Sequence, residues 1–209
     1  MQIQDALLKF TVQLEADGRS PHTIRQYSRH VRALARWLDD TARDGHVEAL
    51  DHEDVAAFLA SPEARRRPDG GLKKAGSMNS LRGSLKGFFG YLHRAGAIPT
   101  DPTRLVRRAL CGRPLPRTIP EADQKKLLAA IDHPRDHLLF HLMLRTGIRL
   151  GSALALDVSD LDLERGEIVL RHAKGDREER VYLPKGIRGE VATFLRRMGS
   201  GPVFRGRGE

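Results

Sequence analysis

Residues 145–156, Arg-Thr-Gly-Ile-Arg-Leu-Gly-Ser-Ala-Leu-Ala-Leu, decide the fold of the second half of the chain. The apolar run at 137–144 predicts a helix that ends at Gly147, where a left-handed residue is expected. Arg149 would then lie at a helix terminus, with its planar guanidinium free to bind a phosphate. A second buried helix is predicted from the apolar residues Leu150, Leu154 and Leu156. On this motif alone, an arginine that binds the carbonyls of a helix C-terminus remains the alternative.

A β-hairpin is predicted after this stretch, because the apolar pattern changes from helical to alternating. An acidic turn at 157–166 precedes two strands, 167–172 and 178–184, which are joined by a turn at 173–177. Lys174 would lie at the tip of the hairpin. A lysine in such a place is more often a charge that aids solubility than a functional group, so its role depends on its neighbours.

The arginine box, the acidic turn, the hairpin with Lys174 and the following Leu183-Pro184 occur in one order over residues 119–184. This arrangement resembles the tyrosine recombinases, the phage-integrase-like family. The resemblance implies that Arg149 holds a phosphate oxygen in the transition state and that Lys174 protonates the departing 5′ oxygen. Ser152 stands where the family box has an acid, which leaves the setting of Arg149 open.

The same resemblance implies site-specific DNA strand exchange through a 3′-phosphotyrosyl intermediate. It implies double-stranded DNA as the partner and neither a metal nor a nucleotide cofactor. The complete family member would work as a homo-tetramer on two duplexes. The family's His-x-x-Arg box and nucleophilic tyrosine would lie beyond Glu209, and Tyr27, Tyr91 and Tyr182 fall on buried helix faces or in a strand.

Two readings of the chain therefore stay open. In the first, it is a C-terminally truncated tyrosine recombinase that binds DNA and is inactive alone. In the second, it is a finished non-catalytic DNA clamp or an interfering truncated recombinase. A helical interaction domain without a DNA role is a third class, which the charge disfavours.

The first half of the chain is predicted to be all-helical. Ser20 and Pro21 are typical of a helix start, apolar stripes mark further helices, and the polar segment 65–74 is predicted to be a mobile loop. This order resembles the SAM-like core-binding domain of the same family. The predicted fold class is thus mainly α with a small antiparallel β-sheet. The all-helical SAM-like domain is expected to be followed by a partial α+β catalytic domain. The predicted boundaries are 1–103 for the helical domain, 104–118 for a basic linker and 119–209 for the catalytic part.

Positive charge dominates the chain and favours a polyanionic partner. The net charge is +9, and up to Thr103 there are 15 Lys and Arg against 13 Asp and Glu, with 21 against 14 after it. Helical spacing places four arginines on one face, and further cations lie on a later helix and in the linker. The residues predicted to contact DNA are Arg25, Arg29, Arg32, Arg36, Arg82, Lys86, Arg107 and Arg108.

Other classes of protein are disfavoured by composition. No apolar run approaches the roughly 18 residues of a membrane span, and the first residues do not resemble an export signal, so a cytoplasmic protein is expected. A lone cysteine, Cys111, excludes an internal disulfide. His133, His137 and His141 recur every fourth residue, but Pro134 separates the first two and no glutamate or cysteine nearby completes a set of ligands. No metal site is predicted.

A helix starting at Pro120 is expected before the arginine box. Its predicted core face consists of Leu127, Leu128 and Ile131. A last helix is expected to carry Ile187, Val191, Phe194 and Leu195.

Overall fold

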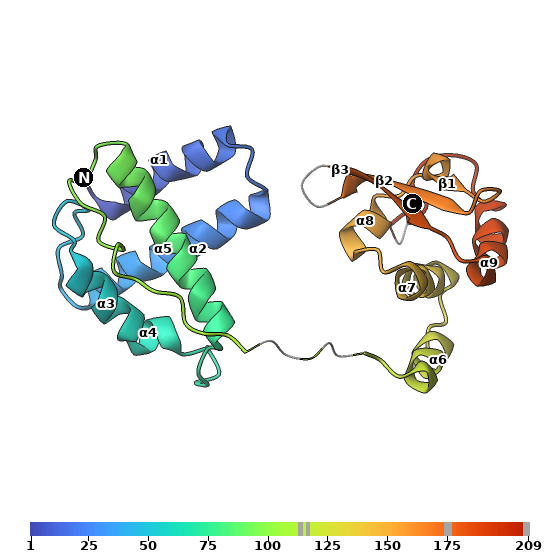
Figure 1. Cartoon of the computed structure of the whole chain (residues 1–209), viewed down its shortest axis with the longest axis horizontal. Coiled ribbons are helices and arrows are strands. Elements are labelled where there is room, and N and C mark those ends of the chain that lie inside the picture. Colours follow the sequence, from blue (N-terminus) through green and yellow to red (C-terminus); the bar gives the residue numbers. More distant parts are fainter. Residues whose placement is uncertain (113–114, 116–117, 174–176, 207–209) are drawn as a thin grey trace. The chain divides into compact units, whose positions relative to one another are not determined.

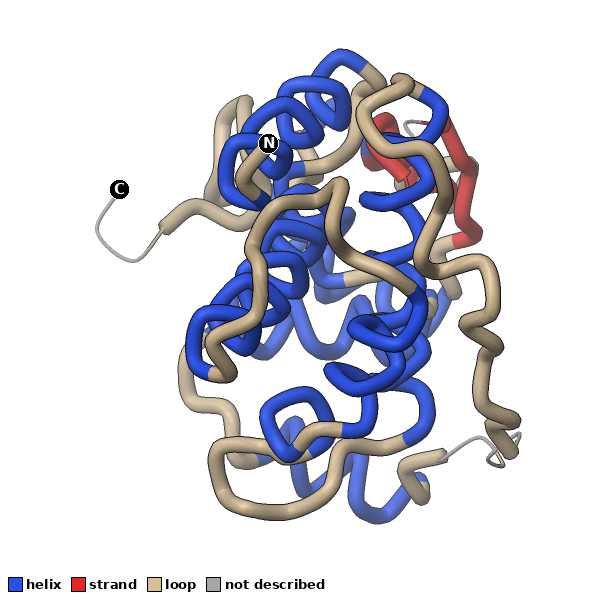
Figure 2. The backbone as a smooth tube through the Cα atoms, turned by 90° about the vertical axis from the view of Figure 1, so that its left-hand side faces the viewer, coloured by secondary structure: helices blue, strands red, loops and turns tan. Residues whose placement is uncertain are grey.

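The computed structural model describes residues 1–112, 115, 118–173 and 177–206 of the 209-residue chain. The chain divides into two compact units, residues 1–114 and 115–209. This division falls inside the segment 104–118, and the linker boundaries themselves stay a prediction. Figure 1 shows the elements of each unit, and Figure 2 shows that helices dominate and that strands are confined to one short sheet.

The first unit is all-helical. Its elements are α1 (Ile3–Ala16), α2 (Pro21–Asp40), α3 (His52–Ala60), α4 (Pro62–Arg65) and α5 (Ala75–Arg94). Helix α2 packs against both α1 and α5. The Ser20 hydroxyl caps α2 by accepting a hydrogen bond of 3.3 Å from the Thr23 N–H. Asp51 and Asp54 form a capping box at the start of α3.

Aromatic side chains fill the centre of this unit. Phe88 lies 5.6 Å from Phe10 and 5.0 Å from Phe89 between ring centroids, and Trp37 lies 5.6 Å from Phe58. All five are buried. Burial of side chains of this size stabilises by about 1.5–3 kcal/mol each, so this core holds α2 and α5 in fixed positions.

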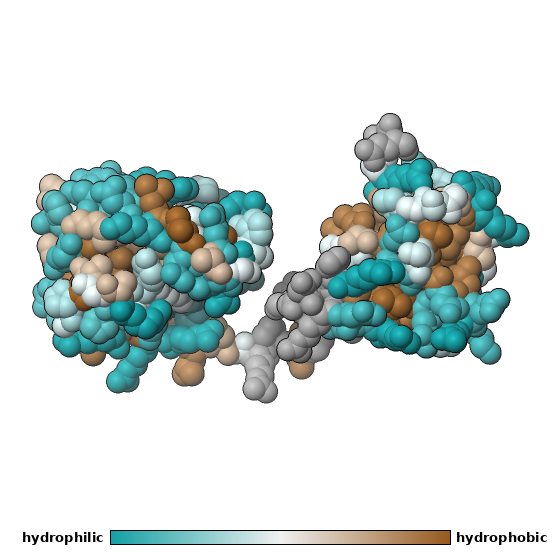
Figure 3. Space-filling view, turned by 90° about the horizontal axis from the view of Figure 1, so that it is seen from above, coloured by the Kyte–Doolittle hydropathy of each residue, from teal (hydrophilic) through white to brown (hydrophobic). Residues whose placement is uncertain are grey.

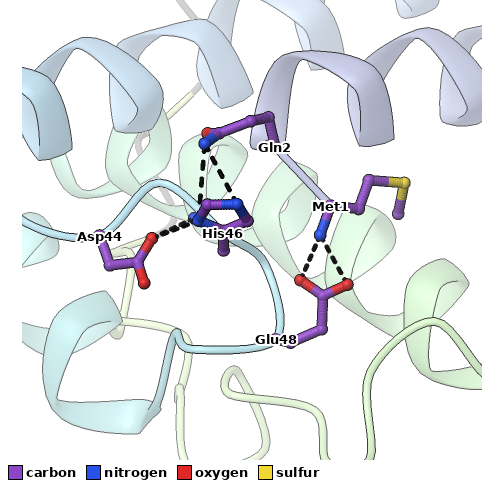
Figure 4. Close-up of polar contacts among 5 residues, drawn as sticks. All are labelled: Met1, Gln2, Asp44, His46 and Glu48. Carbon is purple, nitrogen blue, oxygen red and sulfur yellow. Dashed lines mark hydrogen bonds and ion pairs between the residues drawn. The ribbon is translucent and has the colours of Figure 1, made fainter.

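Polar contacts join the start of α1 to the loop after α2 (Figure 4). The α-amino group of Met1 donates to both carboxylate oxygens of Glu48, at 2.7 and 2.6 Å. Gln2 forms an isolated β-bridge with His46, whose ring Nδ1 lies 2.7 Å from the Asp44 carboxylate. These contacts close the loop over the N-terminal end of α1.

The segment 65–74, which is predicted to be a mobile loop, contains backbone hydrogen bonds of its own. Arg66 and Leu72 form a β-bridge, and the Arg67 N–H donates to the Gly71 carbonyl at 2.7 Å. The Lys73 ammonium donates to the Ala64 carbonyl at 2.7 Å. The segment is therefore a turn closed by its own backbone and held against α4.

The second unit combines helices with a three-stranded sheet. Its elements are α6 (Glu121–Ala129), α7 (Pro134–Thr146), α8 (Leu150–Leu154), the 3-10 helix η1 (Val158–Asp160), β1 (Leu161–Asp162), β2 (Glu167–Ala173), β3 (Arg177–Tyr182) and α9 (Lys185–Leu195). The strand order is β1-β2-β3, and both pairings are antiparallel, with Ile168 opposite Val181. The predicted hairpin and fold class are confirmed, and β1 is an addition that the sequence did not reveal.

Two predictions of burial in this unit are wrong. Helix α6 buries no residue, and Leu127 is 40% exposed, because α6 packs mainly on α7 and not on the sheet. Leu150 and Leu154 are 50% and 41% exposed, and the short α8 is anchored by Ala153 and by Leu156 beyond it. A five-residue helix has room for one inward-facing position, so it cannot bury a long apolar stripe.

Hydrophilic residues cover much of the face of each unit that Figure 3 shows. In the described part of the chain, no helix is long and apolar enough to cross a membrane.

Candidate functional site

Arg149 lies on a short turn between α7 and α8. Gly147 takes a left-handed conformation, with φ of +70°, and its N–H donates to the Met143 carbonyl at 2.9 Å. Gly147 thus ends α7 as predicted, since a side chain would strain this conformation. The next residue, Ile148, is only 6% exposed and fixes the turn to the core. Arg149 then begins α8 as its N-cap residue, in an extended conformation.

The side chain of Arg149 is exposed, and no other residue in the described part of the chain binds its guanidinium. Among the described residues, no hydrogen bond joins Arg149 to a carbonyl of α7. The Leu142 carbonyl accepts from the Thr146 hydroxyl at 2.6 Å, and the Met143 carbonyl accepts from the Gly147 N–H. Hence the alternative, an arginine that binds helix carbonyls, has no support among these residues. A free guanidinium on a fixed turn can bind an oxyanion in bidentate fashion.

A hollow of about 350 Å³ lies beside α8, and Ser152 lines it together with Asp157, Asp160 and Arg171. The Asp160 carboxylate is buried and accepts from the Asp157 N–H at 3.0 Å and from Arg171 Nε at 2.5 Å. The hydrogen bond from Arg171 to Asp160 raises the pKa of that guanidinium. Both oxygens of the Asp160 carboxylate therefore already accept a hydrogen bond, one from Arg171 and the other from the backbone of its own turn.

Lys174 lies outside the described residues, as does the centre of the hairpin turn. The strands on either side, β2 and β3, are described and end at Ala173 and begin at Arg177. The role of Lys174 as proton donor stays a prediction.

The basic face of α2 has the form that the spacing predicts. Arg25, Arg29, Arg32 and Arg36 are all exposed, whereas Val31, Leu34 and Leu38 on the other side of the helix are buried. Within the described ranges, no acid forms an ion pair with any of these four arginines. Four unpaired cations on one helical face repel one another, and a bound polyanion would relieve that repulsion.

A hollow of about 800 Å³ gathers further cations next to this face. We refer to it as the cationic hollow. Its charged and hydroxyl-bearing lining residues are Arg29, Arg36, Glu63, Arg66, Arg67, Lys73, Ser77 and Ser80. Five of these are cations and one is an acid, so the hollow is strongly positive. It joins α2, the closed turn at 65–74 and the start of α5 into one surface.

The charge of the cationic hollow perturbs two titrating groups beside it. Burial, with repulsion from Arg29 and Lys73, lowers the pKa of His30 to about 4. Burial and repulsion from Arg29 also lower the pKa of Lys73. His30 is consequently neutral at pH 7, and its Nδ1 lies 2.8 Å from the Ser84 hydroxyl.

Sequence reasoning did not identify His30 as part of this surface, and it left open whether the segment with Lys73 contacts DNA or is only solvated. Lys73 falls in the segment 65–74, whose basic character was visible but whose closed conformation was not. The signal that could have found it is the pair of Gly70 and Gly71 next to Asp69, since this combination is typical of a tight turn.

The other predicted DNA contacts divide into two groups. Arg82 donates to the Asn79 amide oxygen at 3.3 Å, and the Lys86 ammonium to the Val106 carbonyl at 3.2 Å. The Arg82 bond lies within α5, and the Lys86 bond joins α5 to the segment that follows it. Contact of these two side chains with DNA stays a prediction. Arg107 and Arg108 are exposed.

Two family models match the chain. The phage integrase N-terminal SAM-like domain matches residues 8–96, and the phage integrase family matches residues 117–201. Among curated proteins, tyrosine recombinase XerA of Thermococcus kodakarensis is 29% identical over 197 residues, which make up 91% of this chain and 61% of the relative. Tyrosine recombinase XerD of Pseudomonas aeruginosa is 30% identical over 184 residues, 86% of this chain and 59% of the relative. The chain thus spans about three fifths of the length of these relatives.

Solved structures share the fold. A lambda integrase tetramer bound to a Holliday junction aligns with a TM-score of 0.74 and 19% identity, over 99% of this chain and 60% of that one. A lambda integrase dimer bound to a COC′ core site gives the same TM-score and identity, over 99% of this chain and 57% of that one. At a sequence identity this low, the similarity to these structures shows a shared fold and nothing more.

Proposed function

This chain belongs to the tyrosine recombinase, or phage integrase, family, and we propose that it binds duplex DNA and supplies part of the site that cuts and rejoins a strand in site-specific recombination. The observation that carries the proposal is Arg149, whose free guanidinium stands on a turn fixed by Gly147 and Ile148. Because the turn is anchored to the core by the buried Ile148, the arginine is held ready for charge that develops on a phosphate.

The cationic hollow and the basic face of α2 support DNA as the partner. Five cations and one acid line the hollow, and repulsion from Arg29 adds to burial in lowering the pKa values of His30 and Lys73. A DNA backbone is a dense polyanion that would supply the missing negative charge and release counterions on binding. DNA as the substrate further implies a cytoplasmic location and, by analogy with the lambda integrase assemblies, a tetramer on DNA for the complete protein.

In this proposal the chain alone binds DNA and does not cut it. Tyr27 and Tyr91 pack against Phe10 in the core of the first unit, with centroid distances of 5.6 and 5.3 Å. Tyr182 lies on β3 beneath the Arg188 guanidinium. A nucleophile needs a base and a phosphate clamp around it, and among the described residues no histidine or carboxylate is hydrogen-bonded to any of these three tyrosines. Lys174 is proposed to protonate the leaving 5′ oxygen.

The proposal is tested by joining this chain to the C-terminal part of a relative such as the Pseudomonas aeruginosa XerD. A nicked duplex that carries the relative's recombination site traps the covalent protein–DNA product, which a denaturing gel quantifies. Arg149→Ala is expected to slow its formation by about 10²–10³-fold, the loss typical of removing one oxyanion donor. Lys174→Ala is expected to slow it as well.

Arg145→Ala is the matched control. Arg145 is also exposed, but it lies inside the last turn of α7, before Gly147 turns the chain. Its loss should change the rate by less than about 3-fold, as expected for an exposed charge away from the reacting phosphate. Near-normal cleavage by the Arg149→Ala protein would refute the assigned role.

A non-catalytic DNA clamp is the second candidate. It is favoured by the location of the cationic hollow, which lies wholly within the first unit. This reading predicts salt-sensitive duplex binding by the 209-residue chain and no covalent complex from the joined protein, even with Arg149 and Lys174 intact.

A further inference from the structure

Three side chains from two helices of the second unit meet around one carboxylate. His137 and His141 lie on α7, and Glu190 lies on α9. His137 Nδ1 lies 2.8 Å from one oxygen of Glu190, and His141 Nδ1 lies 2.6 Å from the other. One donor atom from each residue falls within 4.8 Å of the other two.

We propose that His137, His141 and Glu190 form a binding site for a divalent transition-metal ion of the zinc class. Two imidazoles and one carboxylate are a ligand set that suits zinc, cobalt and nickel, whereas calcium and magnesium prefer oxygen ligands alone. Histidines four residues apart lie on the same side of a helix, so α7 presents both imidazoles in one direction. The proposal is independent of the DNA reaction.

The surroundings of the three residues allow an ion to enter. Their side chains are between 19% and 33% exposed, so an ion could reach them from solvent. His137 and Glu190 also line a hollow of about 570 Å³, together with Asp132 and Thr193. Three protein ligands leave a fourth tetrahedral position, which water could fill from this hollow.

An ion at this site would fasten α7 to α9. The two helices already pack against each other through apolar residues, including the buried Leu138 of α7 and Val191 of α9. Helix α7 ends at the turn that carries Arg149, so an ion would stabilise the helix on which that turn depends. Binding to the folded form alone raises its stability in proportion to the logarithm of ion concentration.

The same three groups are compatible with a different explanation. If each Nδ1 carries a proton, both histidines donate to the Glu190 carboxylate and no ion is needed. The two explanations differ in what happens on adding metal: an ion replaces both Nδ1 protons, whereas a pair of hydrogen bonds leaves the ion in solution.

Titration of the 209-residue chain with Co²⁺ and Zn²⁺ distinguishes them. One Co²⁺ ion per chain should give visible absorption bands of tetrahedral type, and Zn²⁺ should displace it and raise the thermal midpoint. Glu190→Gln, His137→Gln and His141→Gln should each weaken binding by at least about 10-fold, since each removes one of three ligands.

His46→Gln and His133→Gln are the matched controls. His46 pairs with the Asp44 carboxylate at 2.7 Å but has Gln2, not a second histidine, on its other side (Figure 4). His133 precedes α7 and belongs to the same four-residue repeat, but it is not among the three clustered residues. Both variants should bind the ion as the unchanged chain does.

Two outcomes would overturn the proposal. The first is an unchanged chain that shows neither Co²⁺ bands nor a Zn²⁺-dependent rise in thermal midpoint. The second is a Glu190→Gln protein that binds as tightly as the unchanged one. Since Gln has the shape of Glu and position 190 is on the partly exposed side of α9, this variant keeps the fold and makes the result decisive even if a histidine variant unfolds.

Discussion

The cationic hollow and the Arg149 turn present positive charge in opposite ways. Cations of the hollow come from α2 and from the closed turn after α4, and Arg66 of that turn donates to the Gly70 carbonyl at 2.8 Å. Arg149 is a single cation whose position is set by one glycine and one buried isoleucine. Five side chains contribute to the positive charge of the hollow, so the loss of one leaves most of that charge in place. The proposed role of Arg149 depends on one side chain.

Replacing Arg149 by lysine should produce the largest effect. Lysine keeps the charge but lacks the planar fork that can bind two phosphate oxygens. In the joined protein, cleavage should fall by about 100-fold or more, while duplex affinity changes by less than about 2-fold. Rates of covalent-complex formation and fluorescence anisotropy measure the two quantities. An equal loss in both would mean that Arg149 acts as an ordinary binding charge.

Removing two cations from the hollow should have a smaller effect and the opposite pattern. The double variant Arg29→Ala with Arg36→Ala should bind duplex DNA about 10- to 30-fold more weakly, and the salt dependence of log K should become shallower by about 2. Arg94→Ala is the control, because Arg94 is exposed at the other end of α5. If all these variants bind alike, the hollow is not the DNA surface.

The pH dependence of stability should report the burial of His30 beside the cations of the hollow. The pKa of His30 is lowered to about 4 in the folded unit from its ordinary value of 6.5, so the unfolded chain takes up its proton first as the pH falls. The stabilising contribution is complete above pH 6.5 and is lost as the pH falls toward 4. The full shift would correspond to about 3 kcal/mol, and solvent screening of this half-buried ring reduces it to on the order of 1–2 kcal/mol.

Urea unfolding at pH 7 and at pH 4.5 measures this loss. His30→Gln keeps a polar group near Ser84 but does not titrate, so its stability should fall less over the same range. Equal losses in the two proteins would assign the pH dependence to other groups.

The exposed side of α6 should give the smallest effect. Leu127→Gln should change the free energy of unfolding by less than about 0.5 kcal/mol, because the side chain is 40% exposed. Leu142→Ala in the buried face of α7 should cost about 2–5 kcal/mol. A large loss from Leu127→Gln would show that α6 is packed more tightly than it is here.

Local signals in the sequence were sufficient for much of the fold. Ser20 before Pro21 marks the start of α2, Gly147 marks the end of α7, and alternation marks the β2-β3 hairpin, since each depends on residues adjacent in the chain. The basic face of α2 was predictable for the same reason: helical spacing alone determines which arginines share a side.

What escaped prediction depends on contacts between distant segments. Glu190 lies 53 and 49 residues from His137 and His141, so no local pattern could join them. Lys73 joins the α2 surface only because the turn at 65–74 is closed. Leu127 fits a helical stripe, but whether a stripe is buried depends on what packs against it.

The dependence of duplex affinity on salt tests the central claim most directly. For the 209-residue chain and a 30-bp duplex, the four unpaired arginines of α2 predict that log K falls with log salt concentration with a slope of about −3.6 or steeper. Arg29→Ala with Arg36→Ala should make that slope shallower by about 2. Affinity that does not change with salt, or a slope that the double variant leaves unchanged, would contradict a DNA-binding role for the cationic hollow.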